Sequence, residues 1–160
     1  RGLGDVYKRQ RMILETWDRE SLTGQEKIIG RTKGSGAPLS GGEEFTPVDL
    51  GMMGSGNQPI VPEDSHVRLA HPDTNDGVQM LRRGYNYADG TDTVGNMDVG
   101  LFFIAMVKDP ATGFVPIQKK LARQDALSEY LRHTGSGLFA VPPGVSQDAA
   151  DYLGRPLFEA

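Results

Sequence analysis

The chain has 160 residues, 17 basic and 21 acidic side chains, a net charge of −4, and no cysteine. These counts exclude disulfides, thiolate zinc sites and cysteine nucleophiles, and they provide no basic footprint for nucleic acid. The 21 glycines and 10 prolines predict one domain with much of its backbone in loops, and no apolar run is long enough to predict a membrane span.

The N-terminal residues Arg1–Gln10 show neither helical nor strand periodicity, nor the pattern of a signal peptide. We therefore expect this stretch to be a non-native tail, or the end of a truncated read, outside the domain. The domain is expected to occupy residues 11–160 as the C-terminal part of a longer protein. Within it, the apolar run Arg11–Trp17 predicts the first strand.

A helix is predicted next, from about Thr23 to Ile29, because Thr23 and Glu26 have the spacing of a capping box and Gly30 follows. Residues 31–63 are rich in glycine and proline and predict a long surface loop. A loop of this length in a compact domain is typical of a lid or another functional segment.

The central stretch Ser65–Ala88 contains two of the three histidines and an adjacent pair of arginines. A turn rich in Pro, Asp, Asn and Gly leads to a predicted strand, Met80–Tyr87. A histidine before such a turn and an arginine after it can face one ligand, because imidazole binds iron and guanidinium stabilises anions. Taken alone, a histidine in a polar loop is more often a surface residue.

Residues 88–99 predict a turn, and the apolar run Gly100–Val107 predicts a central strand buried on both faces. A helix is expected from Pro116 to about His133, with His133 as its C-terminal cap, and Ser136–Val141 predicts the last strand. The resulting order β-α-loop-β-β-α-β predicts an α+β fold, the ferredoxin-like split βαβ, whose antiparallel sheet has helices on one face. Aromatic residues at strand spacing favour core packing over an electron-transfer path; they are Tyr85, Tyr87, Phe102 and Phe103.

Several runs together resemble the C-terminal half of dye-decolorizing (DyP-type) haem peroxidases, in particular the deferrochelatase/peroxidase subgroup. The runs are RMILETWDR, HVRLAHP, LRRGYNYADGTD, GLFFIAMVKDP, FVPIQKKLA and DALSEYLRHTGSGLFAVPPG. They occur in the family's order and spacing from Arg11 to about Phe158. The resemblance implies one haem b per chain and a reaction with hydrogen peroxide.

The resemblance also assigns residues. The histidine of the H-[VI]-R-L-A motif, here His66, is implied as the proximal ligand of the haem iron, and Arg82 as the distal arginine. Arg83 is an alternative for that role, and Arg83 or Arg31 is a candidate for the haem propionates.

Two further features are carried over from the family. The haem-contact tripeptide, usually Asn-Pro-Arg, reads His71-Pro72-Asp73, so only the proline is kept and one expected cationic contact is in doubt. An acid that accepts the proximal imidazole N–H is expected at Asp125, with Glu129 as the second candidate. Such a bond makes the imidazole a stronger electron donor.

The family's distal aspartate belongs to a G-x-x-D-G motif in the preceding domain, and the sequence contains no such motif. The expected partners are therefore haem, hydrogen peroxide and a missing N-terminal domain of the same chain, with a homodimer possible by analogy. The subgroup's export implies a periplasmic or extracytoplasmic location. Two alternatives to the peroxidase remain: a protein that handles or releases haem iron, and a structural module without haem.

Overall fold

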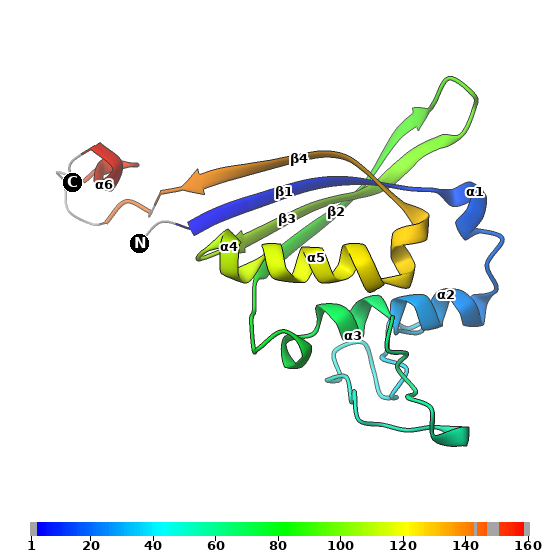
Figure 1. Ribbon diagram of the computed structural model, residues 1–160. Helices are drawn as coiled ribbons and strands as arrows, with labels where there is room; N and C mark the ends of the chain where they lie inside the picture. Colours follow the sequence, from blue (N-terminus) through cyan, green and yellow to red (C-terminus); the bar gives the residue numbers. More distant parts are fainter. Residues whose placement is uncertain (1–2, 143, 147–150, 159–160) are drawn as a thin grey trace.

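The computed structural model describes residues 3–142, 144–146 and 151–158. Its centre is a four-stranded sheet in the order β2-β3-β1-β4, and every neighbouring pair is antiparallel. The strands are β1 (Leu3–Met12), β2 (Leu81–Thr91), β3 (Met97–Val107) and β4 (Leu131–Val141). Helices α2, α3 and α5 lie on one side of the sheet (Figure 1). The ferredoxin-like fold class predicted from the sequence is confirmed.

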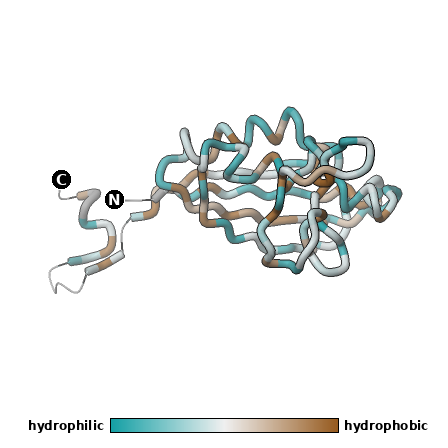
Figure 2. Tube along the Cα trace, turned by 90° about the horizontal axis from the view of Figure 1, so that it is seen from below, coloured by the Kyte–Doolittle hydropathy of each residue, from teal (hydrophilic) through white to brown (hydrophobic). Residues whose placement is uncertain are grey.

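The remaining elements are short and join the strands along the chain. They are α1 (Leu14–Trp17), α2 (Leu22–Ile29), η1 (Ser55–Asn57), α3 (His66–Ala70), η2 (Pro72–Thr74), α4 (Pro110–Gly113), α5 (Val115–Gln124), η3 (Ala126–Tyr130) and α6 (Arg155–Phe158). Viewed from below, the segment that carries α6 stands apart from the sheet (Figure 2). No helix among the described residues has the length and hydrophobicity needed to cross a bilayer.

The first strand corrects two expectations. Residues of Arg1–Gln10 that were expected to lie outside the domain form most of β1, which pairs with both β3 and β4 at the centre of the sheet. Arg11–Trp17, predicted to be a strand, ends β1 and then forms α1. The sequence pattern misled because the side of β1 that faces the helices carries Lys8 and Gln10, so the expected apolar alternation is absent. A non-native or truncated origin of these residues stays a prediction.

Helix α2 begins two residues earlier than its predicted capping box. Ser21, not Thr23, is the N-cap, and its hydroxyl accepts a hydrogen bond from the backbone N–H of Gly24. Gly30 ends the helix as predicted, in the left-handed region with φ of 92°. A Cβ atom at Gly30 would lie 3.1 Å from Cβ of Val67, so this glycine also lets α2 end directly against α3.

The helix predicted from Pro116 to about His133 is shorter in the structure, and His133 does not cap it. Helix α5 ends at Gln124, because Asp125 leaves the helical conformation and caps η3 through the backbone N–H of Leu127. Strand β4 already begins at Leu131, so His133 lies within the sheet, paired with Gln10 of β1. The extended conformation of Asp125 thus divides into α5, η3 and β4 the segment that the sequence pattern predicted as one helix.

The two faces of the sheet differ in cover. The face toward the helices buries Val6, Ala105 and Val107. On the opposite face, no described helix covers the side chains of Leu81, Tyr85 and Phe139, which are 53%, 58% and 57% exposed. The prediction that β3 is buried on both faces is wrong, because Phe102, Ile104 and Met106 are only half-buried on this face. The core position expected for Tyr85 is wrong as well.

Candidate functional site

A cavity of about 500 Å³ lies between the helix-facing side of the sheet and the helices. This volume is typical of small-molecule and cofactor sites. Most of its lining is apolar, from Met12, Ile29, Ala70, Pro72, Val78, Met80, Leu101, Phe103, Phe114, Ile117, Leu121, Leu127 and Leu131. Its polar lining comes from Lys8, Gln10, His66, Gln79, Arg82, Gln118, Asp125, Ser128 and His133. His66, the predicted ligand of the haem iron, and Arg82, the predicted distal arginine, therefore line the same cavity.

Helix α3 is a single short turn that presents His66 at its first position. Ser65 precedes it in an extended conformation, is fully buried, and donates its hydroxyl hydrogen to the carbonyl of Pro62 at 2.7 Å. The helix ends at Ala70, because His71 precedes a proline and adopts an extended conformation. The position of His66 is thus fixed at both ends of its helix.

The imidazole of His66 is oriented by a buried carboxylate. Its Nδ1 lies 2.6 Å from Oδ2 of Asp125, whose side chain is 3% exposed. A carboxylate only accepts hydrogen bonds, so Nδ1 carries the hydrogen, which leaves Nε2 as the nitrogen available to a ligand. The other oxygen, Oδ1, accepts from the backbone N–H of Leu127 at 2.9 Å. Glu129, the second candidate for this role, is exposed.

Strand β2 separates the two adjacent arginines. Arg82 lies opposite Ala105 and lines the cavity, whereas Arg83 lies opposite Ile104. Since successive strand side chains point to opposite faces, Arg83 is directed to the uncovered side of the sheet. Among the described residues no ion pair engages Arg82. Arg31, in the loop, donates to the carbonyls of Gly36 and Glu44 instead.

The tripeptide after α3 is only partly directed at the cavity. Pro72 is part of the lining, whereas Asp73 donates its backbone N–H to Nδ1 of His71 and lies with its carboxylate 3.6 Å from the same ring. The side chain of Asp73 is 78% exposed. Contacts of His71 and Asp73 with haem stay predictions.

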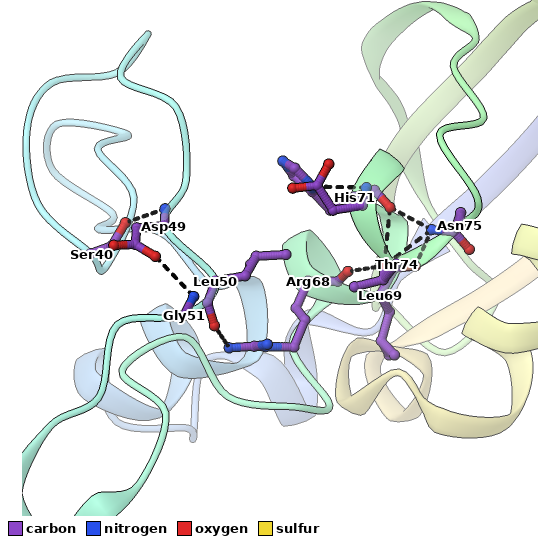
Figure 3. Close-up of polar contacts among 10 residues, drawn as sticks. Ser40, Asp49, Leu50, Gly51, Arg68, Leu69, His71, Thr74 and Asn75 are labelled. Atoms are coloured by element: carbon purple, nitrogen blue, oxygen red, sulfur yellow. Dashed lines mark hydrogen bonds and ion pairs between the residues drawn. The ribbon is translucent and has the colours of Figure 1, made fainter.

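Side chains of the next two residues hold the end of α3 in place (Figure 3). Asn75 donates to the carbonyls of Leu69 and His71, and Thr74 donates to the carbonyls of Arg68 and His71. These bonds satisfy carbonyl groups at the end of the helix, where the carbonyl of Arg68 also accepts the backbone N–H of His71.

The long loop is tied to the same helix. Arg68 donates to the carbonyl of Leu50 at 2.7 Å (Figure 3). It also donates to the carbonyl of Val61 at 2.8 Å. Asp49, just before Leu50, accepts from the backbone N–H of Gly51. Buried residues of the loop, including Pro38 and Val61, show that it packs as part of the domain. Its expected role as a lid stays a prediction.

Six polar residues of the cavity were not assigned to it from the sequence, and three of them, Lys8, Gln10 and His133, lie on β1 and β4. Lys8 and Gln10 are 9% and 8% exposed on β1, and Nε2 of His133 lies 3.1 Å from Nε2 of Gln10. Burial, and then the charge of Lys8, lowers the pKa of His133. Only the correct register of β1 and β4 reveals these residues, because they are remote from the motifs in the sequence.

The donor set suits a cofactor that brings most of its metal ligands with it. One imidazole with a free Nε2 faces a largely apolar space, and a buried carboxylate strengthens it as a donor. A histidine in this setting is the usual single protein ligand on one side of a haem iron. The residues present therefore fit the haem that the sequence resemblance implies.

Comparisons with known proteins agree with this chemistry. The family model "Dyp-type peroxidase, C-terminal" matches residues 4–146. The chain is 46% identical over 155 residues to a dye-decolorizing peroxidase of Thermobifida fusca, covering 96% of the chain and 35% of that protein. It is 41% identical over 162 residues to a deferrochelatase of Shigella flexneri, covering 98% of the chain and 38% of that protein.

Solved structures give the same answer for the fold. Ferric DtpA from Streptomyces lividans superposes with a TM-score of 0.91 at 46% identity, covering 99% of the chain and 43% of that protein. A DyP-type peroxidase from Cellulomonas bogoriensis gives a TM-score of 0.91 at 36% identity, with the same coverage of 99% and 43%. The chain thus spans less than half the length of the proteins it matches.

Proposed function

Because the chain belongs to the DyP-type peroxidase family, matching its C-terminal domain, we propose that it carries the haem site of a haem b-dependent peroxidase. In this proposal the whole protein uses hydrogen peroxide to oxidise bulky substrates and holds one haem b per chain. The observation that carries the proposal is the His66 imidazole, oriented by buried Asp125 in the wall of a cofactor-sized cavity. When bound, haem supplies the redox-active iron.

In the proposal, Nε2 of His66 is the protein's ligand to the haem iron. Asp125 holds the proton on Nδ1, fixes the ring orientation and increases the electron donation of the imidazole, which favours the ferric state. The 3% exposure of the Asp125 side chain supports this role, because water does not compete for the hydrogen bond.

Arg82 is proposed to act on the opposite side of the cavity from α3. Its guanidinium is always charged, comes from the sheet, and lines the same space as His66. There it stabilises negative charge that develops on an oxygen during cleavage of the peroxide. Arg83, the next residue of β2, lies on the other face of the sheet, so Arg83→Ala is a matched control for Arg82→Ala.

The proposal assigns the remaining catalytic group to sequence outside this chain. An acid from a preceding domain is expected to assist proton transfer, and that domain is expected to cover the apolar sheet face around Tyr85 and Phe139. On its own the chain is expected to be inactive or weakly active. A periplasmic or extracytoplasmic location, iron transport and a homodimer are further expectations for the whole protein, by analogy with the family.

A second candidate function is the handling or release of haem iron, with peroxidase activity as a side reaction. Its support is the 41% identity to a protein named deferrochelatase. Both functions use the same site, so they differ in the fate of the haem. In the full-length protein, peroxide-dependent turnover of a dye supports the peroxidase, and recovery of free iron from bound haem supports the alternative.

The first experiment is a haemin titration of this chain and of His66→Ala, followed by the Soret absorbance. We expect saturable binding with a Soret shift in the wild type and no such shift in the variant. Millimolar imidazole should restore the shift in His66→Ala, because the free ligand occupies the space of the missing ring. Thermal unfolding checks that the variant is folded. Equal spectra of the two proteins would contradict the assignment of His66.

A further inference from the structure

Lys8 is a buried cation in the middle of the sheet. It lies on the helix-facing side of β1, opposite Phe103 of β3, and is 9% exposed. Its side chain lines both the cavity that contains His66 and a second cavity of about 440 Å³ toward the start of α5. Four residues are common to both linings: Lys8, Phe114, Gln118 and His133.

The described groups in direct contact with the Lys8 ammonium are neutral. Nζ donates to Oε1 of Gln118 at 2.5 Å and lies 5.2 and 5.8 Å from the ring centres of Phe103 and Phe114. Burial lowers the pKa of Lys8 to about 8, and the negative charge of Asp125 opposes that shift. Since this pKa still lies above 7, the amine is mostly charged at neutral pH. No ion pair within the described residues neutralises it.

A buried charge without an ionic partner is costly, and a ligand that brings the opposite charge offsets the cost. Haem carries its negative charge in propionate carboxylates at the edge of a flat apolar ring. The apolar lining around Phe103 and Leu101 suits the ring, and Lys8 suits a carboxylate. Arg31 and Arg83, the candidates for the haem propionates in the sequence, do not line the cavity. Arg31 donates to loop carbonyls, and Arg83 is on the other face of the sheet.

We propose that Lys8 is a carboxylate anchor of the cofactor site: its ammonium donates a hydrogen bond to a haem propionate inside the cavity. This inference rests on the proposed function, because it takes haem as the occupant, and it takes Lys8 as a native residue of the stretch that the family model matches. It supplies a cationic contact in a chain whose Asp73 stands where the resembling family usually has an arginine. Lys8 is a binding residue in this account and takes no part in the chemistry.

The test compares haemin with haemin dimethyl ester, in which the carboxylates are masked. Both are titrated by Soret absorbance into the wild-type chain, Lys8→Met, and the control Lys119→Met, whose lysine is exposed on the same helix as Gln118. We expect Lys8→Met to raise the Kd for haemin about tenfold, the usual scale of a charge-assisted hydrogen bond, and to leave the Kd for the diester unchanged. Lys119→Met should change neither.

Thermal unfolding without haemin gives an independent readout. Lys8→Met should raise the melting temperature, since it removes a buried charge, so weaker haemin binding would not come from unfolding. Equal changes for haemin and its diester would overturn the inference in favour of a packing role. Tighter haemin binding by Lys8→Met would overturn it by showing that Lys8 opposes the ring.

The same titrations separate this inference from the proposed function. If haemin binding is lost in His66→Ala but unchanged in Lys8→Met, the carboxylate anchor alone is overturned. If haemin binding is weakened in Lys8→Met but unchanged in His66→Ala, the proposed iron ligand alone is overturned. The absence of any saturable binding counts against both for this chain.

Discussion

The two sides of the cavity differ in how completely the chain satisfies their polar groups. On the helical side, His66 bonds Asp125, Asp125 also caps η3, and Asn75 and Arg68 bond backbone carbonyls. On the sheet side, Lys8 has a neutral acceptor, and no described ion pair engages Arg82. The helical side is therefore built to hold one imidazole in one orientation, whereas the cations of the sheet side remain available to an anionic ligand.

This difference has an energetic consequence. Removing a buried partner from a satisfied network leaves donors or acceptors without hydrogen bonds, which costs stability. Removing a buried cation that lacks an ionic partner releases a desolvation cost instead. Substitutions on the two sides of one cavity should therefore shift the folding free energy in opposite directions. The contrast is tested at Asp125, Lys8 and Arg82, in order of decreasing effect on the free energy of unfolding.

Asp125→Ala should have the largest effect, a loss of about 3 kcal/mol in the free energy of unfolding. The substitution removes the acceptor of the His66 Nδ1–H and leaves the buried N–H of Leu127 without its cap. Urea unfolding followed by circular dichroism measures the loss. Glu129→Ala, an exposed change within η3, is the control and should stay within about 0.5 kcal/mol of the wild type.

Asp125→Asn sharpens this prediction, because an amide oxygen can still accept from Leu127. Its loss should be smaller than that of Asp125→Ala. A loss for Asp125→Ala no larger than for the control would show that the helical side is not held together by this carboxylate.

The free energy of unfolding should increase as the pH rises above neutrality, because the buried amine of Lys8 loses its charge. Its pKa falls from 10.5 to about 8 on folding, so the unfolded chain binds more protons than the folded chain between those values. Stability therefore rises with pH across this window, and from pH 7 to pH 9 the gain is about 1 kcal/mol. Urea unfolding at the two pH values measures it.

Lys8→Met isolates that contribution, because the other titrating groups are common to both proteins. The gain in the wild type should exceed the gain in the variant by the same amount, about 1 kcal/mol. Parallel pH profiles would mean that Lys8 is already solvated in the folded chain, and the contrast between the two sides would then fail.

Sequence reasoning predicted the order of strands and helices because most segments carry local signals. Gly100–Val107 is continuous and apolar, and Gly30 ends a helix, whereas the short helix α3 was not predicted because His66 was placed in a polar loop. It failed where pairing outweighs local pattern. β1 is a strand because both its edges bond to neighbours, although Lys8 and Gln10 occupy its buried face.

The site shows the same division. His66 and Arg82 were assigned from motifs, and the structure brings them to one cavity. Asp125 was expected on a helix, and its 2.6 Å bond to His66 exists because the helix ends there. His133 was misread as a helix cap, since the turn at Asp125 starts a strand that places it beside Gln10. Contacts made across the sheet leave no local trace in the sequence.

Arg82→Ala should have the smallest effect on folding, less than about 0.5 kcal/mol, because the exposed guanidinium has no ion pair to lose among the described residues. Its effect should instead be functional. In the full-length, haem-loaded protein, the second-order rate of the reaction with hydrogen peroxide should fall about 100-fold, the usual scale for loss of one electrostatic stabiliser. Arg83→Ala is the matched control, with the same chemistry removed from the opposite face of the same strand. If Arg83→Ala slowed the reaction as much, the arginines would act through the charge of the strand as a whole. A large loss of folding stability in Arg82→Ala would show that the sheet side is as tightly bonded as the helical side.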